Sequence, residues 1–322
     1  MILTVTPNPS LDRTYEVPSL DRGEVLRATA DRVDPGGKGV NVSRAVAAAG
    51  VRTTAVLPLG GTPGTMIAEL LGAQGVDVTA VSIAGQTRSN ISLAEPDGTL
   101  TKINATGPAL TAAESALLLE TVRTCSGGAD WIACCGSLPQ GLAPEWYADI
   151  VTRAHAAGTR IALDTSGPAL LAALPARPDV IKPNASELAA AVGRPLATLG
   201  DVLKAAEELR SLGAGAVLAS LGADGQLLVS EEGTYYGTAA VSSVRSNVGA
   251  GDASLAGFLI AGGTGPAALA SALAHGAAAV QLPGSAMPAP SALRPDAVHV
   301  TQDLPLDLPL SEVPSPEGPS GV

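Results

Sequence analysis

The chain has few of the residues that mark several large classes of protein. Only 2% of its 322 residues are aromatic, so Ala, Val, Leu and Ile must build most of the core. The three cysteines have no metal-ligand spacing. Cys134 and Cys135 are neighbours in the sequence, where a bridge between them is sterically poor, so we expect small, buried, reduced side chains.

Positive charge is also scarce. The formal net charge is −11, and Lys and Arg form no cluster. This argues against nucleic acid or an anionic membrane as a partner. The N-terminus lacks the basic region and long apolar core of a signal peptide, and no apolar run reaches the ~20 residues of a membrane span. We therefore expect a soluble, cytoplasmic protein that gathers its few cations around any anionic ligand.

Two common nucleotide-binding motifs are absent. The segment Gly36-Gly-Lys-Gly39 lacks the earlier glycine of a Walker A motif, and Gly follows Lys38 where that motif has Ser or Thr. No G-x-G-x-x-G follows the first expected strand, which disfavours a dinucleotide-binding fold.

Short apolar runs alternate with helical stretches along most of the chain. We expect strands at residues 2–6, 54–59, 130–135, 160–164, 180–182 and 215–220. We expect helices at residues 40–49, 65–74, 112–124, 144–157, 186–192, 202–212, 253–261 and 267–281. This alternation predicts an α/β fold whose mostly parallel central sheet is flanked by helices.

Two segments and the C-terminal end depart from this rhythm. Residues 11–34 and 89–104 alternate polar and apolar side chains, and the second contains the hairpin-like turn Glu95-Pro-Asp-Gly98. They predict a small antiparallel β-lid on a single domain of residues 1–301. Residues 302–322 are rich in Pro, Ser and Gly with little to bury, so we expect a disordered tail.

The most informative segment is Asn247-Val-Gly-Ala-Gly-Asp252, which precedes a long apolar run. A glycine turn that opens a buried helix binds anions, because unpaired N–H groups and the positive end of the helix dipole meet there. Asp252 would stand beside that point. A phosphate site with a carboxylate aimed into it could move a phosphoryl group onto a hydroxyl; taken alone, the segment could equally be a turn with an Asp cap.

Six segments at sensible spacing resemble one family. They are Thr6-Pro-Asn-Pro-Ser-Leu-Asp12, Pro35-Gly-Gly-Lys-Gly-Val-Asn41, Gly85-Gln-Thr-Arg-Ser-Asn90, Gly136-Ser-Leu-Pro139, Lys182-Pro-Asn-Ala-Ser-Glu187 and Gly249-Ala-Gly-Asp252. In this order, over residues 1–300, the chain resembles the ribokinase-like PfkB carbohydrate kinases. Within them it most resembles the 1-phosphofructokinases and the tagatose-6-phosphate kinases. The resemblance implies a ribokinase-like fold.

The resemblance also implies roles at the transfer site. Asp252 would be the general base, and Gly249, Ala250 and Gly251 would offer N–H groups to the transferred phosphoryl group. ATP and Mg²⁺ would be held by a set on later segments, namely Lys182, Asn184, Glu187, Ser220, Gly222 and Gly225. Of these, Asn184 and Glu187 would contact Mg²⁺ indirectly. Glu187 could equally be only a helix-capping residue.

By the same resemblance, Asp12, Gly37 and Asn41 would bind sugar hydroxyls. The candidates for the existing phosphate of the substrate, or for hydroxyls near it, are Lys38, Arg88, Lys102 and Ser137. Arg88 is preferred because a guanidinium can grip phosphate with two hydrogen bonds. Lys102 could instead be an exposed strand residue.

Lys38 makes fructose 1-phosphate the leading substrate by analogy with relatives that carry Gly-Gly-Lys-Gly. Tagatose 6-phosphate and fructose 6-phosphate remain alternatives, as does a non-catalytic sugar-phosphate sensor. A nucleoside or ribose kinase fits less well, because those acceptors have no phosphate for Lys38 and Arg88 to hold. Relatives often pair their lids, so we expect a homodimer that covers the lid edges.

Overall fold

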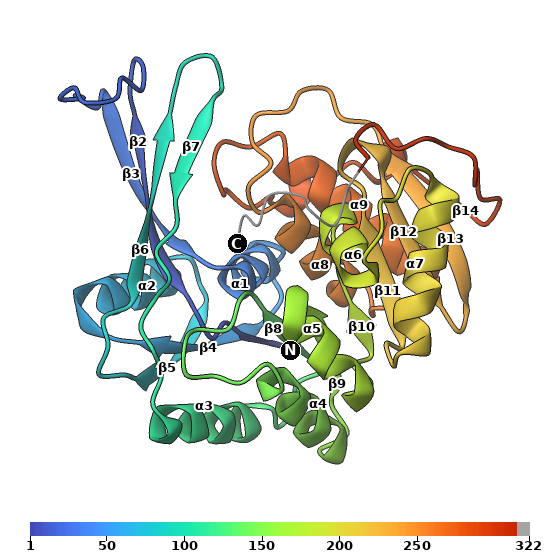
Figure 1. The fold of residues 1–322 in the computed structure, drawn as a ribbon, viewed down its shortest axis with the longest axis horizontal. Coiled ribbons are helices and arrows are strands. Elements are labelled where there is room, and N and C mark those ends of the chain that lie inside the picture. The colour runs from blue at the N-terminus through green and yellow to red at the C-terminus, as the bar shows by residue number, and fades with distance from the viewer. Residues whose placement is uncertain (314–322) are drawn as a thin grey trace.

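The computed structural model describes residues 1–313, whose strands and helices alternate along the chain (Figure 1). The strands are β1 (Ile2–Val5), β2 (Ser10–Glu16), β3 (Ala30–Gly36), β4 (Thr53–Leu59), β5 (Asp77–Ser82), β6 (Arg88–Ala94), β7 (Leu100–Ile103), β8 (Trp131–Cys135), β9 (Arg160–Asp164), β10 (Val180–Ile181), β11 (Ala216–Ser220), β12 (Gln226–Ser230), β13 (Gly233–Ala239) and β14 (Val298–Thr301). The helices are α1 (Lys38–Ala48), α2 (Gly61–Ala73), α3 (Ala112–Cys125), α4 (Trp146–Ala156), α5 (Gly167–Ala173), α6 (Ala185–Val192), α7 (Leu199–Ser211), α8 (Ala250–Ile260) and α9 (Gly265–Ala279).

A ten-stranded sheet runs through the body in the order β14-β13-β12-β11-β10-β9-β8-β1-β4-β5. The strands from β5 to β11 are parallel, and β12 to β14 extend the sheet with antiparallel pairs. This confirms the predicted α/β fold with a mostly parallel central sheet. The carboxyl ends of the parallel strands meet at one edge, where ligands gather in such folds.

Helices cover both faces of this sheet, and the strand residues alternate between them. In β8, Ile132 and Cys134 face a core shared with α3 to α7, whereas Trp131 and Ala133 face a core shared with α1, α8 and α9. Because both faces are covered, side chains that point either way are buried, and the parallel strands therefore read as continuous apolar runs. The second core encloses α8 so closely that every residue from Asp252 to Leu259 is buried.

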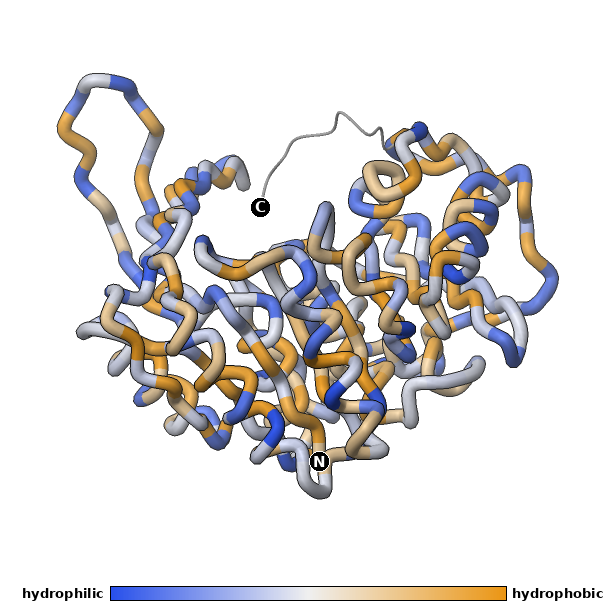
Figure 2. Tube along the Cα trace, turned by 60° about the horizontal axis from the view of Figure 1, so that its bottom comes forward, coloured by the Kyte–Doolittle hydropathy of each residue, from blue (hydrophilic) through white to orange (hydrophobic). Residues whose placement is uncertain are grey.

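The lid is a four-stranded sheet in the order β3-β2-β6-β7, which stands away from the body (Figures 1 and 2). Its outer pairs β2–β3 and β6–β7 are antiparallel as expected, but the central pair β2–β6 is parallel. The two hairpins come from separate parts of the chain, so no turn forces their central strands to run in opposite directions. Because β2 and β6 run parallel, their first residues lie together at the base of the lid, which we call its foot. This foot follows the carboxyl end of β1 in the large sheet.

The prediction of a disordered tail from residue 302 is wrong for the part that the structure describes. Residues 302–313, here called the C-terminal strap, pass the N-terminal end of α7, where Leu308 accepts a backbone hydrogen bond from Leu199. Leu310 is buried in the core. Three strap leucines pack against or in that core, and this burial offsets the entropy of ordering the strap. The rest of the predicted tail, residues 314–322, lies outside the described residues.

None of the helices in residues 1–313 is long and apolar enough to span a membrane. The three cysteines are free, and Cys134 and Cys135 are fully buried as expected.

Candidate active site

The turn before α8 has the form that the sequence predicts. Gly249 is the N-cap residue with φ 80°, a left-handed conformation that glycine adopts without strain, and no side chain caps the helix. A Cβ at Gly251 would lie 3.3 Å from Nζ of Lys182, so the lysine ammonium rests against the first turn of α8. The uncapped N–H groups, the helix dipole and this ammonium together form an anion site.

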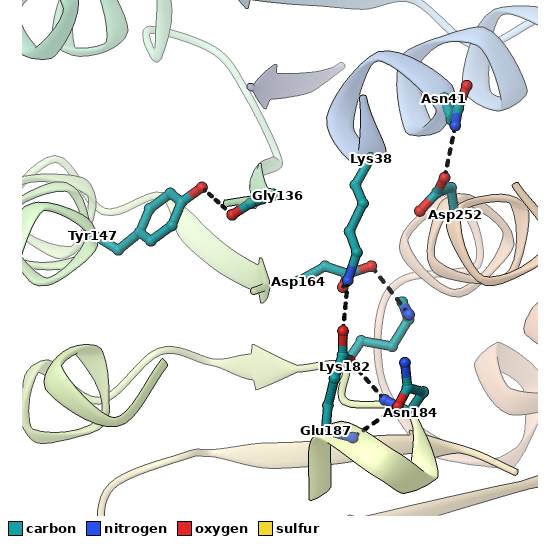
Figure 3. Close-up of polar contacts among 9 residues, drawn as sticks. All are labelled: Lys38, Asn41, Gly136, Tyr147, Asp164, Lys182, Asn184, Glu187 and Asp252. Carbon is teal, nitrogen blue, oxygen red and sulfur yellow. Dashed lines mark hydrogen bonds and ion pairs between the residues drawn. The ribbon is translucent and has the colours of Figure 1, made fainter. Parts of the chain in front are cut away.

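Asp252 stands in this first turn and is 7% exposed. Its Oδ2 accepts a hydrogen bond of 2.9 Å from Nδ2 of Asn41, which reaches across from α1 (Figure 3). Burial and then the charge of Asp164 raise the pKa of Asp252 to about 6, although Lys182, the Asn41 bond and Lys38 oppose the rise. The carboxyl is thus ionised at neutral pH and more basic than an ordinary aspartate, which suits a general base.

A buried network of ion pairs lies next to the anion site (Figure 3). Asp164, at the end of β9, accepts from Nζ of Lys38 at 2.8 Å and lies 3.0 Å from Nζ of Lys182. Asp164 is fully buried and Lys182 is 4% exposed. Burial alone would raise the pKa of Asp164, but Lys182 and Lys38 outweigh it and hold that pKa below its ordinary value. Both lysines remain charged for the same reason, because the carboxylates outweigh burial and raise their pKa values.

Glu187 has the capping role, one of the two that the sequence left open, and its second carboxylate oxygen binds Lys38. Its Oε2 accepts from the backbone N–H of Asn184 at 2.9 Å, while Oδ1 of Asn184 accepts from the N–H of Glu187, so the two form a capping box on α6. Its Oε1 accepts from Nζ of Lys38 at 2.9 Å. Capping fixes the carboxylate so that one oxygen faces the buried network.

The other predicted nucleotide residues lie at the end of β11 and in the turn after it. The N–H of Ser220 donates to Pro183 O, which places Ser220 beside Asn184. Gly222 and Gly225 lie in the turn to β12, with φ 62° and 92°. Space around the Cβ position of Gly222 is open, so a flat ligand could lie against this backbone.

Asp12 lies at the foot of the lid, within a cluster of small polar side chains. Its Oδ1 accepts from Ser10 Oγ at 2.7 Å and from Asn90 Nδ2 at 3.0 Å. Gly36 lies so close that a Cβ there would collide with the Asp12 carboxylate. The glycine is therefore required by the approach of Asp12, and Gly37, the N-cap of α1, follows it directly.

Arg88 is near this cluster but is occupied by the backbone. Its two Nη atoms donate to Ala105 O at 2.8 Å and to Asn8 O at 2.9 Å. Within residues 1–313, Nε of Arg88 and Oδ1 of Asn8 are buried without a hydrogen-bond partner. Asn8 also donates weakly to Ser137 Oγ at 3.5 Å. Arg88 and Asn8 each thus keep one polar atom without a partner, and Asn8 lies beside Ser137.

Within residues 1–313, two predicted substrate residues form no hydrogen bond or ion pair with the cluster at the foot of the lid. Lys38 forms its ion pairs with Asp164 and Glu187. These groups, with Lys182, Asp252 and the turn before α8, are here called the transfer end of the site. Lys102 is exposed on β7, opposite Ser92 in the register. Their roles as substrate ligands stay predictions.

Asp164, Asn8, Ser10 and Asn90 are not among the site residues predicted from the sequence. Asp164 did carry a signal, because it ends a buried strand at the carboxyl edge of the sheet. The other three lie within the matched segments, but only the fold brings them together. Buried Tyr147 adds a support that the sequence could not indicate: its hydroxyl donates to Gly136 O at 2.9 Å and anchors the turn before Ser137 (Figure 3).

The profile of the pfkB family of carbohydrate kinases matches residues 7–292. The chain belongs to this family, and is thus a phosphotransferase with a hydroxyl group as acceptor. It is 40% identical to the 1-phosphofructokinase of Rhodobacter capsulatus, over 80% of this chain and 82% of the relative. It is 34% identical to the ATP-dependent 6-phosphofructokinase isozyme 2 of Mycobacterium tuberculosis, over 88% and 85%. The crystal structure of phosphofructokinase-2 from Escherichia coli in complex with potassium superposes with a TM-score of 0.85 at 34% identity, over 90% of this chain and 96% of that one.

Proposed function

We propose that the protein transfers the γ-phosphoryl group of ATP to the 6-hydroxyl of fructose 1-phosphate, giving ADP and fructose 1,6-bisphosphate. The observation that carries the proposal is Asp252, a carboxylate with a raised pKa in the first turn of an uncapped helix and against a buried lysine. The choice of sugar rests on the 1-phosphofructokinase among the relatives.

In the proposed reaction, Asp252 accepts the proton of the 6-hydroxyl. The hydroxyl oxygen bonds to the γ-phosphorus, and the bond from that phosphorus to the leaving oxygen of ADP breaks. The N–H groups of Gly249, Ala250 and Gly251 and the ammonium of Lys182 stabilise the charge on the transferred group. Asn41 orients the base through its hydrogen bond to Oδ2.

For the nucleotide, we propose Lys182, Asn184, Glu187, Ser220, Gly222 and Gly225, which surround the ends of β10 and β11. No group of three or more His, Cys, Asp or Glu side chains in residues 1–313 could hold a metal by itself. Mg²⁺ usually keeps several waters and binds one or two carboxylates together with substrate phosphates. Glu187 and Asn184 offer the oxygen atoms that such an indirect contact needs, and the bound ion would neutralise phosphate charge.

For the sugar, we propose Asp12, Gly37 and Asn41 for hydroxyls, and Arg88, Ser137, Lys38 and Lys102 for the phosphate or its surroundings. The Nε atom of Arg88, which has no partner within residues 1–313, supports the role of Arg88 as a phosphate ligand. Lys38 would have to leave a carboxylate in order to reach the sugar. A rise in the KM of the phosphosugar in a Lys38→Met variant would support that role, and a fall in kcat alone would assign Lys38 to the transferred group.

Fructose 6-phosphate is the second candidate, because a 6-phosphofructokinase is also among the relatives. Tagatose 6-phosphate would use the same catalytic residues. A non-catalytic sensor fits less well, since Asp252, Asn184 and Glu187 are all present and connected as described.

We further propose that two copies pair through their lids. Within residues 1–313, the edge strands β3 and β7 pair with one strand each, and Leu100 and Ile103 on β7 are exposed. Free cysteines and the use of ATP agree with a cytoplasmic protein.

The first experiment is Mg²⁺-dependent ADP release with fructose 1-phosphate, fructose 6-phosphate and tagatose 6-phosphate in parallel. We expect kcat/KM to favour fructose 1-phosphate by more than about tenfold, or ~1.4 kcal/mol. A preference for another of the three would change the acceptor but leave the mechanism. No turnover with any of them would contradict the proposed function.

A further inference from the structure

Arg44 is a buried cation next to the site that neither the motifs nor the proposed reaction uses. It lies on α1, one turn after Asn41, and is 7% exposed. Its Nη1 donates to Oδ1 of Asn41 at 3.1 Å and to Oγ of Ser285 at 3.1 Å. Its Nε donates to Oε1 of Gln74 at 2.7 Å. A guanidinium held at both ends in this way has little freedom to move.

This arrangement fixes the amide of Asn41. A guanidinium can only donate hydrogen bonds, so the amide face that meets Arg44 must be the oxygen. The NH₂ group is then turned toward Asp252, which as an ionised carboxylate can only accept. Asn41 is therefore oriented from both sides, and its donor reaches the base only while Arg44 holds the oxygen.

Arg44 also supplies a charge on one side of the base. The carboxylates that face it are Asp34, Asp12 and Asp252, with Arg32 opposing them, and burial lowers the pKa of its guanidinium. Asp252 itself faces Asp164, Lys182 and Lys38 on its other sides. Lys182 and Lys38 thus compensate the base from the nucleotide side, and Arg44 does so from the lid side.

We infer that Arg44 is a positioning residue for the general base: it locks the amide of Asn41 so that Nδ2 donates to Asp252 and aims that carboxylate at the acceptor hydroxyl. The inference rests on the proposed role of Asp252 as the base. Arg44 itself touches neither substrate nor the transferred group in this scheme.

The test compares Arg44→Met, Arg44→Lys and the exposed control Arg153→Met, using the phosphosugar that the native protein turns over best. Loss of the charge and of the Asn41 bond disfavours the ionised base. We therefore expect the acid limb of the kcat–pH profile to move upward by about one pH unit in Arg44→Met, with kcat at neutral pH reduced about tenfold or more. Arg44→Lys keeps the charge and one donor, so the acid limb of its kcat–pH profile should lie between those of the native protein and Arg44→Met. The control should match the native protein.

A measurement without substrate separates this inference from the proposed function. The titration of Asp252 can be followed by NMR of protein labelled with ¹³C at aspartate carboxyls, with Asp252→Asn identifying the signal. We expect the midpoint to rise in Arg44→Met even if none of the three sugars is the substrate. An unchanged midpoint and acid limb in a folded Arg44→Met protein would show that Arg44 only packs, and would overturn the inference.

If Arg44→Met does not fold, Ser285→Ala and Gln74→Leu release the guanidinium from its other two anchors. Each should move the Asp252 midpoint upward by a smaller amount. Native midpoints in both variants and in Arg44→Lys would also overturn the inference.

Discussion

Around Asp164, each of the four charged groups is held by a group of opposite charge, and two of the four, Asp164 and Lys182, are buried. At the foot of the lid, by contrast, Asp12 and Arg88 are half-buried and bind amides, hydroxyls and backbone oxygens. The first region belongs to the ends of strands in the ten-stranded sheet, and the second to a sheet that stands away from the body. In the proposed function, the chemistry is thus built on the body and most of the sugar recognition on the foot of the lid. Lid closure would exclude water from the transfer site.

The largest effect should come from Asp252→Asn, which leaves the shape of the transfer end but removes its base. We expect kcat to fall by about 10²–10⁴, with little change in either KM. The folded state raises the pKa of Asp252 from 3.8 to about 6, so the protonated carboxyl stabilises the fold and this contribution is lost as the pH rises from the first value through the second. The variant should therefore melt higher than the native protein at pH 7. Near-native kcat would contradict the assignment of the base.

Lys182→Met tests the buried charge of the transfer end. Removing one partner of a buried pair typically costs about 3–5 kcal/mol, which denaturant unfolding would measure, and activity should be lost as well. The double variant Lys182→Met/Asp164→Leu should regain part of the stability but no activity. Lys204→Met, which removes an exposed pair at 3.9 Å to Asp201, should cost no more than ~0.5 kcal/mol. Equal losses in the two single variants would remove the contrast between buried and exposed pairs.

Gly36→Ala tests the lid end, because its Cβ would displace the Asp12 carboxylate. We expect the KM of the phosphosugar to rise about tenfold, the worth of one hydrogen bond to a charged group, with the KM of ATP unchanged. Gly72→Ala, in a helix with open space at its Cβ position, is the matched control and should leave both values as they are. An equal rise in the KM of the phosphosugar and the KM of ATP would mean that the sugar and nucleotide ends of the site are not independent.

The smallest effect should come from the C-terminal strap. Ser311 donates to the Asp224 carboxylate through its N–H at 2.7 Å and also through Oγ, and Asp224 lies in the turn that we assign to the nucleotide. Ser311→Ala should cost about 1 kcal/mol or less and raise the KM of ATP about twofold. The exposed Ser243→Ala serves as control. A change in the KM of the phosphosugar instead would separate the strap from the nucleotide end.

Most of the parallel half of the sheet was predictable because its strands other than β5 are short apolar runs. The run at 160–164 coincides with β9, and that at 54–59 lies within β4. Strand β5 was missed, since most of its residues are exposed or half-buried at the sheet edge and leave no apolar run. The antiparallel strands β12 to β14 were missed as well. The strap was misjudged because composition does not reveal that a few leucines find a core to pack against.

For the site, the glycine turn and Asp252 could be predicted because they are local. The partners of Lys38 could not, since Asp164 and Glu187 follow it by 126 and 149 residues and meet it only through the fold. Arg44 gave no signal for the same reason: its position three residues after Asn41 is local, but its contact with Ser285 is not.

The cancellation of charge around Asp164 has a consequence for the encounter with substrates. Lys38 and Lys182 are matched by Asp164 and Glu187, so beyond the Debye length of about 8 Å these four groups look neutral. An approaching nucleotide or sugar phosphate, itself an anion, then meets the field of a chain with net charge −11. Added salt would screen this repulsion, so we expect capture of substrate to become faster as ionic strength rises, which is the reverse of electrostatic steering.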